Sequence, residues 1–83
     1  MSSEEDLKRD VTAIVAEVAE VEPVDVAADA KLEDLGIDSL DGLRIVAAVE
    51  KKFGVVIDET EIAKIRTMPD IFDLVRRYGA EAV

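Results

Sequence analysis

Residues 39–54 read SLDGLRIVAAVEKKFG and decide the fold class. At about 100° per residue, one side of this segment forms a continuous apolar stripe, which is typical of a helix packed on a core. The stripe consists of Ile45, Val46, Val49 and Phe53. Because a helix commonly ends with a glycine in the left-handed conformation, Gly54 is expected to stop this one. The sequence therefore predicts a helix from Ser39 to Lys52 with its stripe facing a core.

The same helix has a second apolar strip, which consists of Leu40, Leu43 and Ala47. Glu50 lies between the two strips on the helical wheel, so a single buried surface cannot easily take both. Two interpretations stay open. Either the chain that precedes the helix covers the second strip, or the strip faces a partner protein. Exposed apolar side chains rimmed by charges are typical of a weak docking surface.

An amphipathic helix is also predicted at the start of the chain. Ser3 followed by Asp6 resembles a helix start, with acidic residues favouring the positive end of the helix dipole. The apolar residues that follow recur with a helical period: Leu7, Val11, Ile14, Val15 and Val18. Pro23 disfavours helical backbone at the residue before it, so this helix is expected to end near Val21.

Two more helices are predicted in the last third of the chain. Asp58 and Glu61 have the spacing of a capping box and precede a short helix. The final helix begins at Thr67, and Gly79 is expected to end it. Its apolar face consists of Ile71, Leu74, Val75 and Tyr78. The fold class is therefore all-α, a small bundle of three longer helices plus one short helix, in a single domain over residues 1–83.

Residues 23–37 form a long connection between the first two helices, 15 residues without clear periodicity. Loops of this length in so small a domain are often functional. A short helical turn is expected at residues 32–35, closed by Gly36. The apolar residues expected to anchor the connection in the core are Val24, Val26, Leu32, Leu35 and Ile37.

Composition excludes several classes of function. The chain has 20 acidic and 10 basic residues, a net charge of −10, so a nucleic-acid partner is not expected. It has no Cys and no His, which removes the disulfide, the thiol nucleophile and the commonest ligand of zinc. No metal site or membrane span is predicted. The acidic first residues lack the features of a signal peptide, so we expect a cytoplasmic protein. The net charge of −10 favours a monomer.

Ser39 stands at the start of the central helix, directly after Asp38. One interpretation is that its side chain caps the helix. The other is that the hydroxyl is modified, because a phosphate ester there would meet free backbone N–H groups and the positive end of the helix dipole. The chain has no His to activate the hydroxyl, so another enzyme would have to perform that chemistry.

The run from Leu32 to Leu40, LEDLGIDSL, resembles the signature of acyl carrier proteins, and the similarity continues through residues 49–57 to Thr67. The resemblance implies a non-catalytic carrier. Ser39 would be the attachment site of 4′-phosphopantetheine, which a phosphopantetheinyl transferase transfers from coenzyme A with the help of a divalent metal. Asp38 would help to dock the transferase or to orient its metal. Acyl groups would then travel on the arm as thioesters.

The resemblance also implies two sets of binding residues. The central helix would be the recognition surface for acyl-transferring and condensing enzymes, through Leu40, Asp41, Leu43, Arg44, Ala47 and Glu50. The acyl chain would enter between helices, with candidate lining residues Ile45, Val46, Ile57, Ile62 and Leu74. Arg44 occupies a position where Glu is typical in carriers of bacterial fatty-acid synthesis. The pathway therefore stays open between fatty-acid, polyketide and specialised lipid biosynthesis.

Two alternatives to an acyl carrier are kept. The first is an unmodified acidic helical interaction module that docks through the second apolar strip, in which Ser39 would only cap a helix. The second is a carrier of aminoacyl or peptidyl groups, although an Asp before the modified serine favours acyl cargo.

Overall fold

The structure, a computed structural model, describes residues 4–82. Helices make up the regular structure of this range, and no strand occurs in it. The elements are, in order, α1 (Glu4–Ala19), η1 (Pro23–Asp25), η2 (Leu32–Leu35), α2 (Ser39–Phe53), α3 (Glu59–Ile62) and α4 (Met68–Ala82), where η marks a 3-10 helix. The predicted all-α class, with three longer helices and one short one, is confirmed. No helix within residues 4–82 is both long and apolar enough to cross a membrane.

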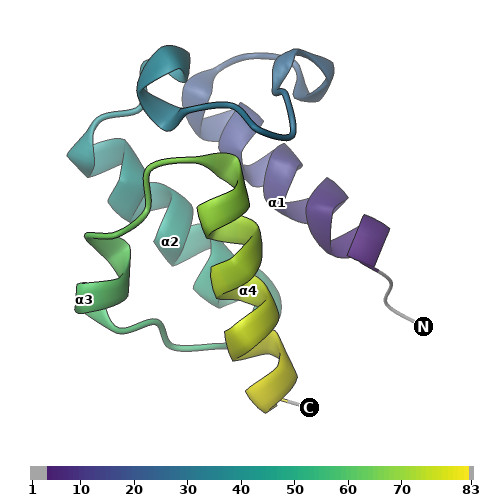
Figure 1. The fold of residues 1–83 in the computed structure, drawn as a ribbon, viewed down its shortest axis with the longest axis vertical. Coiled ribbons are helices and arrows are strands. Elements are labelled where there is room, and N and C mark those ends of the chain that lie inside the picture. The colour runs from purple at the N-terminus through teal and green to yellow at the C-terminus, as the bar shows by residue number, and fades with distance from the viewer. Residues whose placement is uncertain (1–3, 83) are drawn as a thin grey trace.

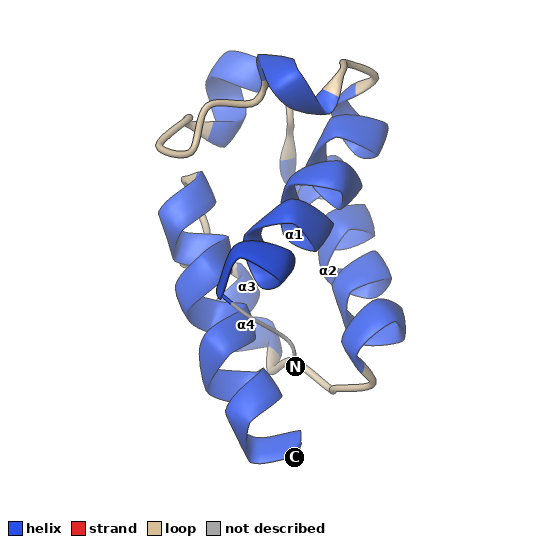
Figure 2. Ribbon diagram, turned by 90° about the vertical axis from the view of Figure 1, so that its right-hand side faces the viewer, coloured by secondary structure: helices blue, strands red, loops and turns tan. Residues whose placement is uncertain are grey.

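The three long helices pack around one core, and the connection from α1 to α2 crosses one end of the bundle (Figures 1 and 2). Each long helix contributes an apolar stripe, so the core forms where the stripes meet. The largest fully buried side chains are Val11, Val15, Ile45, Val49, Met68, Ile71 and Val75. The short helix α3 lies beside α2 and contributes no buried residue.

The predicted core stripe of α2 is only partly correct. Ile45, Val46 and Val49 are buried as expected. Phe53 is half-buried and packs against the core from its edge. It is the last residue of α2, one position beyond the predicted end, and Gly54 follows in the left-handed conformation with φ of 67°.

The first helix ends at Ala19, two residues before the predicted end. Glu20 adopts the left-handed conformation with φ of 60°. Its N–H donates to the carbonyl of Glu17 at 3.2 Å, and the N–H of Val21 donates to the carbonyl of Ala16 at 3.0 Å. These two bonds form a Schellman motif, which turns the chain before Pro23 is reached. The predicted start at Ser3 lies outside the described residues.

The long connection is anchored as predicted, with one exception. Val26, Leu32 and Ile37 are buried, and Leu35 is half-buried against the core. Val24 is 89% exposed, so its predicted role as an anchor is wrong. It lies in η1, a single turn without any buried residue, and Val26 already occupies the core position nearby. The predicted turn at residues 32–35 is present as η2, and Gly36 closes it with φ of 77°.

The capping box forms at α4 rather than at α3. The N–H of Thr67 donates to the Asp70 carboxylate at 3.1 Å, and the N–H of Asp70 donates to the Thr67 hydroxyl at 3.4 Å. At α3, Asp58 caps the helix by accepting from the N–H of Thr60 at 2.8 Å. The carboxylate of Glu61 is used elsewhere, in ion pairs, so the box predicted there is not formed.

The predicted end of the last helix is wrong. Gly79 lies inside α4, which continues to Ala82. A glycine inside a helix costs about 1 kcal/mol relative to alanine, too little by itself to end a helix of this length. The residues after it, Ala80, Glu81 and Ala82, include no proline that would stop the helix.

Candidate functional site

Ser39 is the first residue of α2 and is not its cap. Asp38 takes that role: its backbone is extended, and its Oδ1 accepts from the N–H of Asp41 at 2.9 Å. The interpretation of Ser39 as the cap is therefore wrong. Its side chain is exposed, and its hydroxyl has no hydrogen-bond partner within residues 4–82. A hydroxyl with no structural bond to break is available for chemistry.

Two backbone N–H groups beside that hydroxyl also have no partner within residues 4–82. The amides of Asp41 and Gly42 bond to the side chain and the carbonyl of Asp38, at 2.9 Å each. The amides of Ser39 and Leu40, at the first two helical positions, have no carbonyl one turn earlier to donate to. They leave partial positive charge at the end of a 15-residue helix. A phosphate ester on Ser39 would lie against these donors.

Ser39 lies at the edge of an open groove of about 1020 Å³. The groove is bounded by η2, the first half of α2, the α3 segment and the start of α4. Its lining is mainly apolar and includes Leu32, Ile37, Ile45, Ile62, Ile65 and Ile71. A flexible chain attached at Ser39 could therefore fold back onto an apolar surface. These observations fit a phosphopantetheine arm with acyl cargo.

The structure divides the five candidate lining residues. Ile45 and Ile62 line the groove. Val46, Ile57 and Leu74 are buried in the core and do not line it. Val46 is 4% exposed and faces the core instead of the groove. Sequence reasoning did not assign Leu43, Ile65 and Ile71 to this groove; the apolar period of α4 had identified Ile71 only as a core residue.

The second apolar strip of α2 is exposed. Leu40 and Leu43 are 58% and 51% exposed, and Ala47 is exposed as well. The connection between α1 and α2 therefore does not cover the strip, and the first of the two interpretations is wrong. Leu43 also lines the groove, so the strip continues into the groove beside Ser39.

The charged residues around the strip have different surroundings. Arg44 lies 3.9 Å from the carboxylate of Asp41, and both belong to the same helix face. Such an exposed pair contributes little to stability, so Arg44 remains available to a partner. Glu50 accepts from the N–H of Ile57 at 2.8 Å and is half-buried. Glu50 therefore fixes the link between α2 and α3, a structural role that the sequence did not reveal.

Residues 9–75 match the family model described as a phosphopantetheine attachment site. The chain is also 39% identical over 71 residues to the acyl carrier protein of Thermosynechococcus vestitus, covering 84% of this chain and 88% of that relative. The chain belongs to the acyl carrier protein family. Acyl carrier proteins are not enzymes, and their cofactor is 4′-phosphopantetheine.

Solved acyl carrier proteins share the fold. The crystal structure of the Thermotoga maritima acyl carrier protein superimposes with a TM-score of 0.83 at 28% identity, over 96% of this chain and 94% of that one. The hexanoyl acyl carrier protein of the actinorhodin polyketide synthase from Streptomyces coelicolor superimposes with a TM-score of 0.74 at 26% identity. The match covers 100% of this chain and 96% of that one. Family membership favours a carrier over the unmodified interaction module.

Proposed function

We propose that Ser39 is the residue that holds the 4′-phosphopantetheine arm. The observation that carries this proposal is the unbonded, exposed hydroxyl of Ser39 at the positive end of α2, beside an apolar groove. Asp38 supports it, because by capping α2 itself it leaves the serine free. The other two serines of the chain, Ser2 and Ser3, lie in its first three residues, before the family match begins.

The attachment step needs a partner enzyme. The Ser39 oxygen displaces adenosine 3′,5′-bisphosphate from coenzyme A, forming a P–O ester bond as the pyrophosphate P–O bond breaks. A base of the phosphopantetheinyl transferase takes the hydroxyl proton, since the chain has no His to do so. Only Oδ1 of Asp38 is used in capping, so its other oxygen can face the transferase or the divalent metal of that enzyme.

The arm supplies the thiol that this chain lacks, and acyl groups form thioesters with it. The acyl chain lies in the groove between Ile45 and Ile62, where burial of its methylene groups is favourable by about 0.8 kcal/mol each. Val46, Ile57 and Leu74 remain predicted contacts for cargo that reaches the core.

The exposed strip of α2 is the proposed docking surface for the transferase and for acyl-transferring and condensing enzymes. Leu40, Leu43 and Ala47 form its apolar part, and Asp41 and Arg44 form its charged rim. Glu50 contributes its charge to this rim while it holds the backbone of Ile57.

The pathway in which this carrier works depends on which enzymes bind the docking surface of α2. We propose acyl transfer in fatty-acid, polyketide or specialised lipid biosynthesis, with Arg44 as the residue that discriminates between them. A partner built to meet an acid at this position would be repelled by Arg44. We also propose that residues 1–83 act as one domain and as a monomer, in the cytoplasm. The core supports the single domain, because its buried residues form one cluster between Val11 and Val75.

Loading with hexanoyl-coenzyme A tests the proposed function. A broad-specificity transferase and Mg²⁺ should add hexanoyl-phosphopantetheine to the wild type, and hydroxylamine should then remove the hexanoyl group while the arm stays. Ser39→Ala, which keeps Ser2 and Ser3, should gain nothing. A modified Ser39→Ala protein would refute the assignment of the site, and a hexanoyl group that resists hydroxylamine would refute the thioester.

A further inference from the structure

The segment that forms one wall of the groove meets the core through two half-buried side chains, Ile62 and Ile65. Residues 58–67, which include α3, contain no buried residue. The buried side chains of Ile57 and Met68 fix the two ends of the segment. A helix of four residues has no stability of its own, so contacts with the rest of the protein must hold α3 in place. The wall that faces the proposed cargo is therefore the part of the groove most easily displaced.

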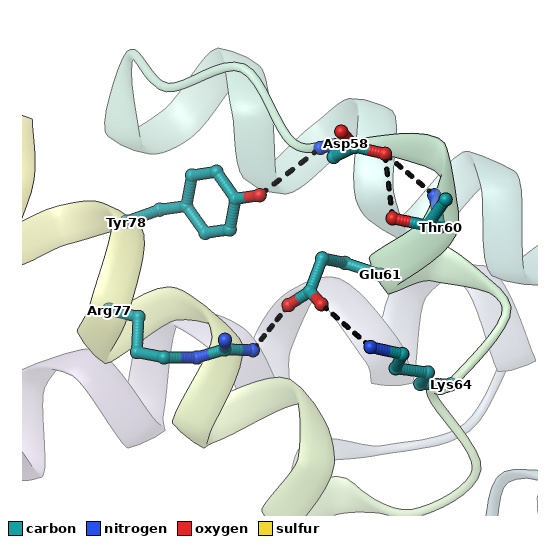
Figure 3. A network of polar contacts seen from close by, with 6 residues as sticks. All are labelled: Asp58, Thr60, Glu61, Lys64, Arg77 and Tyr78. Carbon is teal, nitrogen blue, oxygen red and sulfur yellow. Dashed lines mark hydrogen bonds and ion pairs between the residues drawn. The ribbon is translucent and has the colours of Figure 1, made fainter.

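In addition to this apolar packing, polar contacts with α4 hold this wall (Figure 3). The carboxylate of Glu61 pairs with the guanidinium of Arg77, 16 residues away, and with Lys64 at 3.3 Å. The hydroxyl of Tyr78 accepts from the N–H of Asp58 at 3.3 Å. Arg77 and Tyr78 are consecutive residues of α4, so both contacts attach α3 to the same turn. We name the pair Glu61–Arg77 and the pair Asp58–Tyr78 together the α3–α4 clasp.

The clasp lies near the surface, and the side chain of Arg77 is 62% exposed. The side chain of Glu61 is only 15% exposed in its ion pair with Arg77. The hydrogen bond from Arg77 is the main reason that the pKa of Glu61 lies below its usual value. The carboxylate therefore stays charged under ordinary conditions and remains paired.

The clasp and the groove lie on different sides of α3. Ile62 and Ala63 line the groove that reaches Ser39. Glu61 instead lines a smaller hollow between α3 and α4, together with Leu74 and Arg77. Arg77 and Tyr78 line no part of the groove within the described chain. If α3 moved outward to make room in the groove, its spacing to α4 would change and the clasp would have to break.

We propose that the α3–α4 clasp sets the length of acyl chain that the groove retains, so that Arg77 and Tyr78 are positioning residues for cargo that they do not touch. This inference rests on the proposed function, with the arm at Ser39. With the clasp closed, α3 keeps the position in which it bounds the groove of about 1020 Å³. With the clasp broken, α3 moves outward, and longer chains gain apolar contact while short chains lose it.

The test compares thioester lifetimes across chain lengths. Wild type, Arg77→Gln and Tyr78→Phe are each loaded with acetyl, hexanoyl and tetradecanoyl arms, and intact mass confirms loading. Hydroxylamine cleavage then measures how well each chain is shielded. Arg9→Gln is the matched control, because Arg9 also pairs with an acid, Asp6, but within α1. Arg77→Lys keeps the charge and should behave almost as wild type.

We expect the ratio of tetradecanoyl to hexanoyl lifetime to rise about threefold in Arg77→Gln, the size expected for one lost surface ion pair. Tyr78→Phe should change the ratio in the same direction with the fold unaltered by circular dichroism, since its ring remains. A ratio equal to that of wild type in both variants would overturn the proposal, as would an equal change in Arg9→Gln. The proposal would also be overturned if, in the wild type, neither the hexanoyl nor the tetradecanoyl thioester lived longer than the acetyl thioester. Failed loading of the wild type would contradict the attachment at Ser39, and the clasp proposal with it.

Discussion

Glu20 is the only described residue other than glycine with a left-handed backbone, at φ of 60°. It stands at the position of a Schellman motif where glycine is commonest, with its own N–H on Glu17 and the N–H of Val21 on Ala16. A side chain with a β-carbon is strained there, because the β-carbon approaches the following carbonyl oxygen. Replacing Glu20 by glycine should therefore stabilise the protein.

The size of the gain follows from two opposing effects. The left-handed conformation costs about 1–2 kcal/mol for an L residue with a β-carbon. Glycine also lowers stability by roughly 0.4–1 kcal/mol, because it gives the unfolded chain more conformational freedom. The difference between these two ranges spans about 0 to 1.6 kcal/mol, and we take its middle, about 0.5–1 kcal/mol, as the net gain for Glu20→Gly. In a domain of this size that corresponds to a rise in Tm of about 2–8 °C.

Thermal unfolding followed by circular dichroism measures this gain, with Glu20→Ala as the control. Alanine removes the negative charge but keeps the β-carbon and thus the strain. We expect Glu20→Gly to melt clearly above both the wild type and Glu20→Ala. If Glu20→Ala rose by as much as Glu20→Gly, the gain would come from charge, and the argument from backbone strain would be refuted. A Tm of Glu20→Gly at or below that of wild type would refute it as well.

Three further substitutions give distinct expectations. Phe72→Ala should lower the free energy of unfolding by about 3–5 kcal/mol, because the Phe72 ring is buried. Phe53→Ala should lower it by only about 1–2 kcal/mol, because the Phe53 ring is half-buried. Equal losses of stability in a urea titration would contradict this expectation. The pKa of Glu61 lies below its usual 4.5 because of Arg77, so the pair stabilises the fold above that pH and less as the pH falls through the folded value. The gap in Tm between wild type and Glu61→Gln should thus narrow in acid, and a constant gap would count against it. Arg44→Glu should raise turnover with a ketosynthase of fatty-acid synthesis, by removing a repulsion; unchanged turnover would show that Arg44 does not discriminate.

The helices were predictable because their apolar periods are strong. In α2, the three inner positions of the predicted stripe are buried, and the exposed strip could be identified as a surplus that one core cannot take. The period does not show where along the bundle a helix stops contacting its neighbours. For this reason Phe53 fits the stripe in sequence but is half-buried in the structure.

Capping was harder to predict, because several acids and hydroxyls compete for the same amides. Asp38 and Ser39 are adjacent, and either could cap α2 by its residue type. The extended backbone at Asp38 decides the competition in favour of its carboxylate. In the same way Glu61 has the spacing to cap α3, but Arg77, which is distant in sequence, takes its carboxylate. Long-range partners of this kind leave no local signal.

The attachment residue could be predicted from the sequence, but the residues that line the groove were harder to predict. Ser39 could be identified from its neighbours in sequence, and the structure shows it exposed at a groove. The lining depends on which apolar side chains face the groove and which face the core, and the apolar period alone does not separate the two. Val24 illustrates the same limit, since an apolar residue in a loop can equally be an anchor or fully exposed.

The most direct test of the central claim is the intact mass of the protein after incubation with coenzyme A, Mg²⁺ and a phosphopantetheinyl transferase. We predict that the wild type gains the mass of one phosphopantetheine and that peptide mapping places it on Ser39. Ser39→Ala, with the same helical spectrum, should gain none. A wild type that stays unmodified with transferases of two different specificities, or an arm found on Ser2 or Ser3, would contradict the claim.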